Sequence, residues 1–212
     1  MTRIMTPESP RLVRPPRWAD AVLRSLLPPG QAETVSGDLL EAYRDSVFPS
    51  RGREEADRWF LRQVAGFAWR ATWVWALLLA MLTVGRDALD WFVPPADFRF
   101  RSIITTYAAM AIFVACGGLA AYRTRSLRAS ALAGFTTGAI GGVMKIAGVL
   151  PVLALIAFRQ DPATSGAIDY AGGLDEVFVL PAFILLPGVL LATLGGVLGK
   201  TTAWVVGPRH TG

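Results

Sequence analysis

The chain has 212 residues, of which 53% are hydrophobic and 17% are charged, and its formal net charge is +5. Its mean hydropathy of +0.43 is too high for a soluble globular protein, so the totals indicate a membrane protein. One cysteine and one histidine exclude an intrachain disulfide and a four-ligand Cys/His metal site, and we expect no cofactor.

Residues 1–64 are polar and are expected to fold as a small helical head. They hold ten arginines and nine acidic residues, without the basic-aromatic runs of a nucleic-acid-binding protein, so nucleic acid is not an expected partner. Proline pairs at 15–16 and 28–29 and a break at Pro49–Gly52 delimit three predicted helices. The third, from about Glu54, continues into the first apolar segment. Apolar stripes on these helices predict a core built from Trp18, Leu23, Leu39, Tyr43 and Trp59.

Three blocks in the head carry a resemblance to a known bacterial domain. They are Arg14–Pro29, Glu33–Arg44 and Ala56–Val64. Over residues 14–66 the chain resembles the prefix domain that precedes the first transmembrane helix of ABC-transporter permeases of the macrolide-exporter type. It is also similar to helical domains that tether membrane partners of winged-helix transcription regulators. The rest of such a permease is absent, so the resemblance implies a cytoplasmic module on a bacterial membrane part and does not imply transport.

Asp38, Glu41 and Arg44 are the candidate residues for docking a partner. Two interpretations stay open for this stretch. In one, Gly37 allows close helix approach while the carboxylates form caps or salt bridges with arginines. In the other, the residues form a partner-binding face. Paired carboxylates without a histidine or a metal-ligand companion are weak evidence for catalysis, so we expect no enzyme.

Four apolar segments follow the head, and each is long enough for a helix that crosses a bilayer. They give an all-α integral membrane protein with a cytoplasmic three-helix head on residues 1–64, a four-helix bundle on residues 65–206 and a tail on residues 207–212. Counted in alternate loops, 15 basic residues lie on the N-terminal side and four on the other. The bias predicts a multi-pass protein of the bacterial inner membrane with both termini in the cytoplasm. The predicted spans are residues 67–84, 102–122, 130–158 and 177–199.

Lys145 is the candidate polar site inside the membrane, because an ammonium in the middle of a span is costly and suggests function. We find no carboxylate inside another predicted span, and Asp175 and Glu176 are the nearest candidates by depth. Ligand or ion handling is one interpretation of Lys145. The other is that its side chain reaches a small aqueous recess or freed carbonyls.

Small residues recur every four positions in the third span, at Ser130, Gly134, Gly138 and Gly142. Such a face permits close helix packing, and we expect a seam within the bundle, with a homodimer seam as the second choice. A further pattern is an internal echo: Ala115–Leu119 in the second span resembles Thr193–Val197 in the fourth. A duplicated two-helix hairpin and chance both explain it.

The predicted function is non-enzymatic. The head docks a protein partner, either a transporter subunit or a cytosolic regulator, and the bundle anchors it in the lipid bilayer or senses the state of the membrane. The alternative is a small transporter or channel-like protein that uses Lys145 and a fourth span kinked by Pro181 and Pro187. A membrane-embedded enzyme ranks third, because no nucleophile, base and orienting group occur together.

Overall fold

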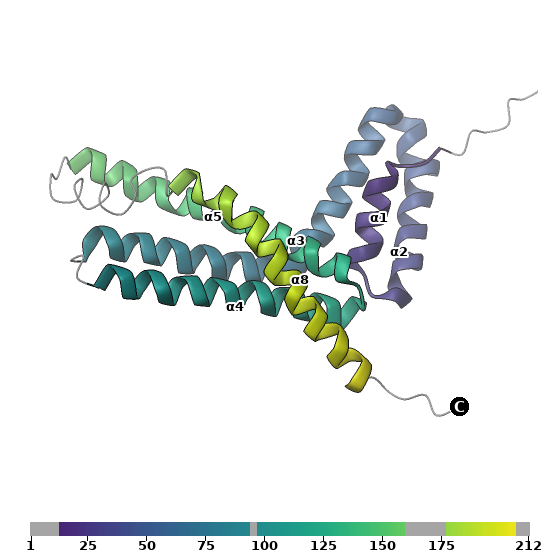
Figure 1. The fold of residues 1–212 in the computed structure, drawn as a ribbon. Coiled ribbons are helices and arrows are strands. Elements are labelled where there is room, and N and C mark those ends of the chain that lie inside the picture. The colour runs from purple at the N-terminus through teal and green to yellow at the C-terminus, as the bar shows by residue number, and fades with distance from the viewer. Residues whose placement is uncertain (1–12, 94–96, 160–176, 207–212) are drawn as a thin grey trace, which may run out of the picture. The chain divides into compact units, whose positions relative to one another are not determined.

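The computed structural model describes residues 13–93, 97–159 and 177–206, and its regular elements over these ranges are all helices (Figure 1). The prediction of an all-helical chain is thus confirmed for the described residues. The chain divides into two compact units, with the boundary between Phe67 and Ala68, and each unit is described by itself. The elements are α1 (Arg17–Leu26), α2 (Pro29–Ala42), the π-helical turn η1 (Tyr43–Val47), α3 (Phe48–Phe92), α4 (Phe98–Thr124), α5 (Leu127–Arg159) and α8 (Leu180–Val206).

The head contains α1, α2, η1 and the first part of α3. Its helices begin where the prolines predict: Pro16 is the N-cap of α1, and Pro28 is the N-cap of α2. The break after the second helix falls at Gly52, whose φ of 77° and ψ of 175° interrupt α3. Pro49 does not end the helix, because it follows the π-helical turn η1. That wider turn relieves the clash between the proline ring and the preceding carbonyls.

The head has a hydrophobic core of its own. Tyr43 lies at its centre, with its ring edge-on to Phe60 at 6.1 Å and its hydroxyl donating to Asp57 Oδ1 at 2.6 Å. The predicted core is wrong at Trp18, which is 61% exposed. On α1 the small Ala19 lies one helical turn before Leu23, and these two residues, not the bulky Trp18, face the core. The buried members are Ala19, Leu23, Tyr43, Ala56, Phe60 and Val64, and Leu39 and Trp59 pack against them partly buried.

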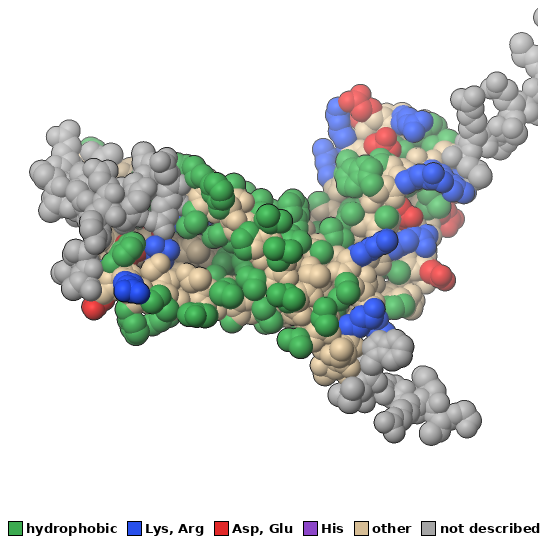
Figure 2. Space-filling model, in the orientation of Figure 1, with side chains coloured by type: hydrophobic (Ala, Val, Ile, Leu, Met, Phe, Trp, Pro, Cys, Tyr) green, Lys and Arg blue, Asp and Glu red, His purple; other side chains and the backbone are tan. Residues whose placement is uncertain are grey.

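The second unit contains the rest of α3 together with α4, α5 and α8. Four helices of the described chain are long and apolar enough to cross a membrane, as the sequence predicts. Hydrophobic side chains cover the face of this unit that Figure 2 shows. The predicted end of the first span at Val84 is too early for the helix, since α3 continues to Phe92. α8 runs through Pro187 as one helix, and Pro181 falls in its first turn, where a proline is tolerated.

Candidate functional site

Lys145 has an ion partner within the bundle. Its Nζ lies 3.0 Å from Oδ2 of Asp87, and the two residues are 2% and 5% exposed. Lys145 is on α5 and Asp87 is on α3, so the pair joins two of the four apolar helices. Within the described residues, Asp87 Oδ2 accepts no hydrogen bond of regular geometry. The nearby ammonium is therefore what compensates the burial of this oxygen.

The prediction that no other span supplies a carboxylate for Lys145 is wrong, because α3 extends beyond the predicted end of the first span. The predicted first span ends at Val84, which leaves Asp87 outside the predicted spans. Asp175 and Glu176, the partners then considered, lie outside the described residues. A signal for Asp87 was present: no helix breaker occurs before Pro94. Continued helical spacing then places Thr83, Asp87 and Trp91 on one face, and all three are buried.

A second charged cluster surrounds Asp90, one helical turn further along α3. Arg86 Nε donates to Asp90 Oδ2 at 3.1 Å, and Arg101 Nε on α4 donates to Asp90 Oδ1 at 2.9 Å. The Arg86 guanidinium also lies over the ring of Phe98, 5.7 Å from its centroid. These side chains are largely buried. Asp87 and Asp90 of α3 thus attract cations from three helices, an arrangement that was not predicted from the sequence.

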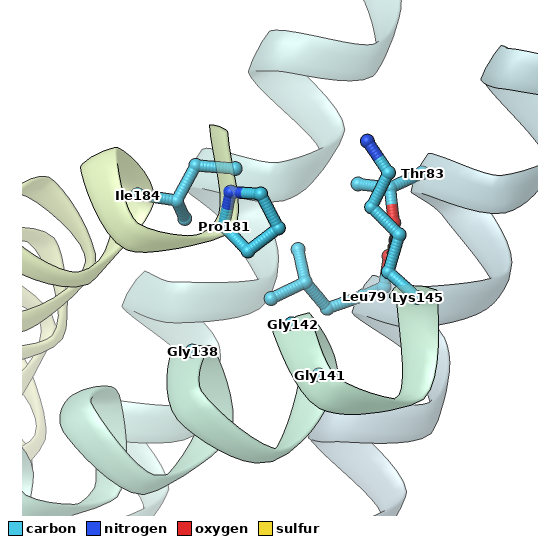
Figure 3. Close-up of a pocket in the computed structure, with 8 residues that line it drawn as sticks. All are labelled: Leu79, Thr83, Gly138, Gly141, Gly142, Lys145, Pro181 and Ile184. Carbon is cyan, nitrogen blue, oxygen red and sulfur yellow. Dashed lines mark hydrogen bonds between the residues drawn. The ribbon is translucent and has the colours of Figure 1, made fainter. Parts of the chain in front are cut away.

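The cavity beside Lys145 is too small for an organic ligand. Its volume of about 10 Å³ is close to the lower limit for one water molecule. Glycines of α5 form one wall, and Pro181 and Ile184 of α8 form another, while the Lys145 side chain extends from α5 toward Thr83 of α3 (Figure 3). A proton or a single water is the largest species that this space accommodates.

The small-residue stripe of α5 lies against α8. A Cβ atom at Gly134 would come within 2.6 Å of Ala192 Cβ, one at Gly138 within 3.1 Å of Leu185 Cδ2, and one at Gly142 within 2.9 Å of Pro181 Cβ. Each glycine therefore faces α8 at a distance where a larger side chain does not fit without movement. The structure places the stripe in a seam within the chain.

The echoed Gly-Gly motifs of α4 and α8 contact each other. A Cβ atom at Gly117 would overlap the carbonyl oxygen of Ala192, and one at Gly195 would overlap the carbonyl oxygen of Val114. A shift of 78 residues carries Gly117 onto Gly195 and Val114 onto Ala192, so the two contacts are reciprocal. This is the pattern expected of two parallel helices related by a local two-fold axis. The sequence echo thus coincides with a close backbone approach between these helices.

Cys116 is buried beside this crossing, and its Sγ lies 3.2 Å from Thr137 Oγ1 of α5. Ser130 of α5 donates to the carbonyl of Gly117 at 2.9 Å. These polar contacts link α4 to α5, so Cys116 packs as a small buried side chain. His210 lies outside the described residues.

Asp38, Glu41 and Arg44 are all exposed on the head, the first two on α2 and the third in η1. Neither carboxylate has an ion pair within the described part of the chain. A Cβ atom at Gly37 would meet nothing within 4 Å, so Gly37 is not a point of close helix contact in the head. The interpretation in which Gly37 allows close helix approach and the carboxylates form salt bridges therefore lacks the contacts that it requires.

Comparison of the chain with models of protein families, with curated proteins and with solved structures found no match. The resemblance of residues 14–66 to a permease prefix domain stays a prediction.

Proposed function

We propose that this chain is a non-enzymatic, multi-pass membrane protein whose helical head docks a protein partner in the cytoplasm. The observation that carries the proposal is the exposed charged face of Asp38, Glu41 and Arg44 on a head that has its own core. The two carboxylates make no ion pair within the described residues, so they are available to contact a partner. Exposed, unpaired charges on a rigid helix give a partner both orientation and specificity.

The four apolar helices would anchor this head in a bacterial inner membrane. The asymmetry of basic residues supports an arrangement with both termini in the cytoplasm. The buried charges of the bundle support an anchoring role, because Asp87 and Asp90 have cationic partners within it. A second copy of the chain is a further possible partner of the bundle.

Cross-linking and recovery of partners from membranes tests the docking proposal. Replacing Asp38 and Glu41 together by alanine should lower partner recovery about tenfold, which corresponds to about 1.4 kcal/mol of binding free energy. The matched control replaces Glu33 and Glu55, two other exposed acidic residues of the head, and removes the same charge. Limited proteolysis of the head checks that both variants remain folded.

Two results would defeat the docking proposal. One is an unchanged set of partners in the Asp38/Glu41 variant. The other is an equal loss in the Glu33/Glu55 control, which would mean that only the net charge of the head matters.

A small transporter or channel-like protein is the second candidate, favoured by the buried pair of Lys145 and Asp87. An ionisable group inside a span is by default a functional candidate. The cavity of about 10 Å³ restricts the cargo to protons or water in this conformation. Flux in liposomes that Lys145→Met abolishes, while Lys200→Met leaves it intact, would favour this candidate over docking.

A further inference from the structure

The head carries a basic hollow that the docking face does not use. It has a volume of about 380 Å³ and lies at the start of α1. Figure 2 shows several basic side chains on the head, in the region where Figure 1 places α1 and α2. The residues that line the hollow are Arg14, Pro15, Arg17, Asp20, Arg24 and Leu40.

The hollow has an excess of positive charge, with three arginines against one aspartate. Arg24 Nε is paired with Asp20 Oδ2 at 3.0 Å. Neither Arg14 nor Arg17 has an ion pair within the described part of the chain. Two guanidinium groups therefore border the same hollow, and no carboxylate among the described residues of the head pairs with either of them.

Part of the hollow is fixed in place by the fold. Asp20 accepts a hydrogen bond of 2.5 Å from Ser36, a buried residue of α2, and it holds Arg24 from the other side. Pro15 is buried and Leu40 is partly buried, so the floor belongs to the packed part of the head. A charged site with a fixed floor requires less ordering when an anion binds.

We propose that this hollow is a binding site for a phosphate group. The net charge of its lining side chains is +2, and a phosphate monoester carries about −1.5 to −2 at neutral pH. One guanidinium group donates two parallel hydrogen bonds to two oxygens of a phosphate, a geometry that an ammonium group does not provide. The volume lies within the range of roughly 300–1,000 Å³ that is usual for ligand sites.

Two sources supply such a group: a lipid headgroup that ends in a phosphate monoester, as in phosphatidic acid, and a soluble phosphate compound. Trp18, exposed beside Arg17 on α1, suits the lipid source, since tryptophan favours the headgroup layer of a membrane. The site is independent of the docking face, because the residues of the two do not overlap.

The test uses the full chain in nanodiscs of phosphatidylcholine, titrated calorimetrically with inorganic pyrophosphate. We expect saturable binding that weakens at least about tenfold when Arg14 and Arg17 are both replaced by alanine. Arg14→Lys with Arg17→Lys should weaken it less, because the charge remains while the paired geometry is lost. The matched control replaces Arg51 and Arg62, two exposed arginines elsewhere on the head, and should bind like the parent.

A second arm identifies the source, using nanodiscs of equal parts phosphatidylcholine and phosphatidic acid, whose headgroup is a phosphate monoester. If lipid headgroups fill the site, these discs should suppress pyrophosphate binding. They should also shield Trp18 from acrylamide, measured as the difference in emission between the parent and Trp18→Phe. If the source is soluble, pyrophosphate should bind equally in both kinds of disc.

Any one of three results would overturn the proposal. The first is no saturable pyrophosphate binding together with no shielding of Trp18. The second is an equal loss of binding in the Arg51/Arg62 control. The third is binding of a polyglutamate peptide without binding of pyrophosphate, which would assign the hollow to an acidic protein segment.

Discussion

Replacing Lys145 by methionine is the most direct test of the ion pair between α3 and α5. The change keeps the length of the side chain and removes the ammonium that lies 3.0 Å from Asp87 Oδ2. At an effective dielectric constant of about 20, two unit charges at this distance attract by about 5–6 kcal/mol. The desolvation of both groups offsets much of that attraction, so the pair itself adds little net stability.

Removing one partner of the ion pair should lower the free energy of unfolding more than removing both partners. Lys145→Met leaves the carboxylate of Asp87 buried without its cation, and such a loss costs about 3–5 kcal/mol. Replacing Asp87 by leucine should cost a similar amount, because the buried ammonium is then left alone. The double variant leaves neither charge, and we expect its free energy of unfolding to return to within about 1–2 kcal/mol of the parent.

The assay is equilibrium unfolding in mild detergent for the parent, the two single variants and the double variant. Lys200→Met is the matched control, since Lys200 is only partly buried, and it should change stability by no more than about 0.5–1 kcal/mol. If the effects of Lys145→Met and Asp87→Leu simply add in the double variant, the two side chains are not energetically coupled. That result would refute a stabilising ion pair between α3 and α5.

Three further predictions concern the packing within the head and within the bundle, each taken separately. Burial, followed by the hydrogen bond to Asp57, raises the pKa of Tyr43 from its usual 10.0 to about 12. The unfolded chain therefore loses this proton first as the pH rises. The head should keep its full stability below pH 10 and lose up to about 2–3 kcal/mol between about pH 10 and 12. Limited proteolysis in urea measures this loss, and Tyr43→Phe should lack it. Gly52→Ala should destabilise the head by about 1–3 kcal/mol in the same assay, because the backbone at Gly52 has a positive φ that alanine rarely adopts; no effect would contradict the observed break in α3. Gly195→Ala should lower the stability of the bundle in detergent by about 1–3 kcal/mol, because its Cβ would meet the backbone of α4. Gly85→Ala, in open space on α3, should leave bundle stability unchanged or slightly raised.

Helical periodicity and prolines were sufficient to predict the all-helical fold and four apolar helices, because both signals are local. They also predicted the head boundaries at Pro16 and Pro28 and a break within Pro49–Gly52, where the chain is interrupted at Gly52. The sequence did not show which residue of that stretch makes the break, because a proline is a conditional signal. Pro49 is accommodated after a π-helical turn, whereas Gly52 adopts a backbone conformation that ends the helix.

The candidate site was less predictable, since it depends on contacts between distant segments. Lys145 could be identified from its isolated charge, but Asp87 could not be paired with it without knowing how far α3 extends. Trp18 shows the same limit on a smaller scale. Trp18 and Ala19 are neighbours in the sequence, and the packing of the whole head, which periodicity alone does not show, buries Ala19 and leaves the tryptophan exposed.

The pair of Asp87 and Lys145 also has a consequence for the order in which the protein is made. In the proposed membrane-spanning arrangement, α3 enters the bilayer first, and Asp90 meets Arg86 on the same helix at once. The cation that pairs with Asp87, the ammonium of Lys145, is synthesised 58 residues later. At about 5–20 residues per second, the delay lasts about 3–12 s. During that interval the carboxylate of Asp87 lacks the ammonium of Lys145. The insertion of the first span is therefore completed only when α5 supplies that ammonium.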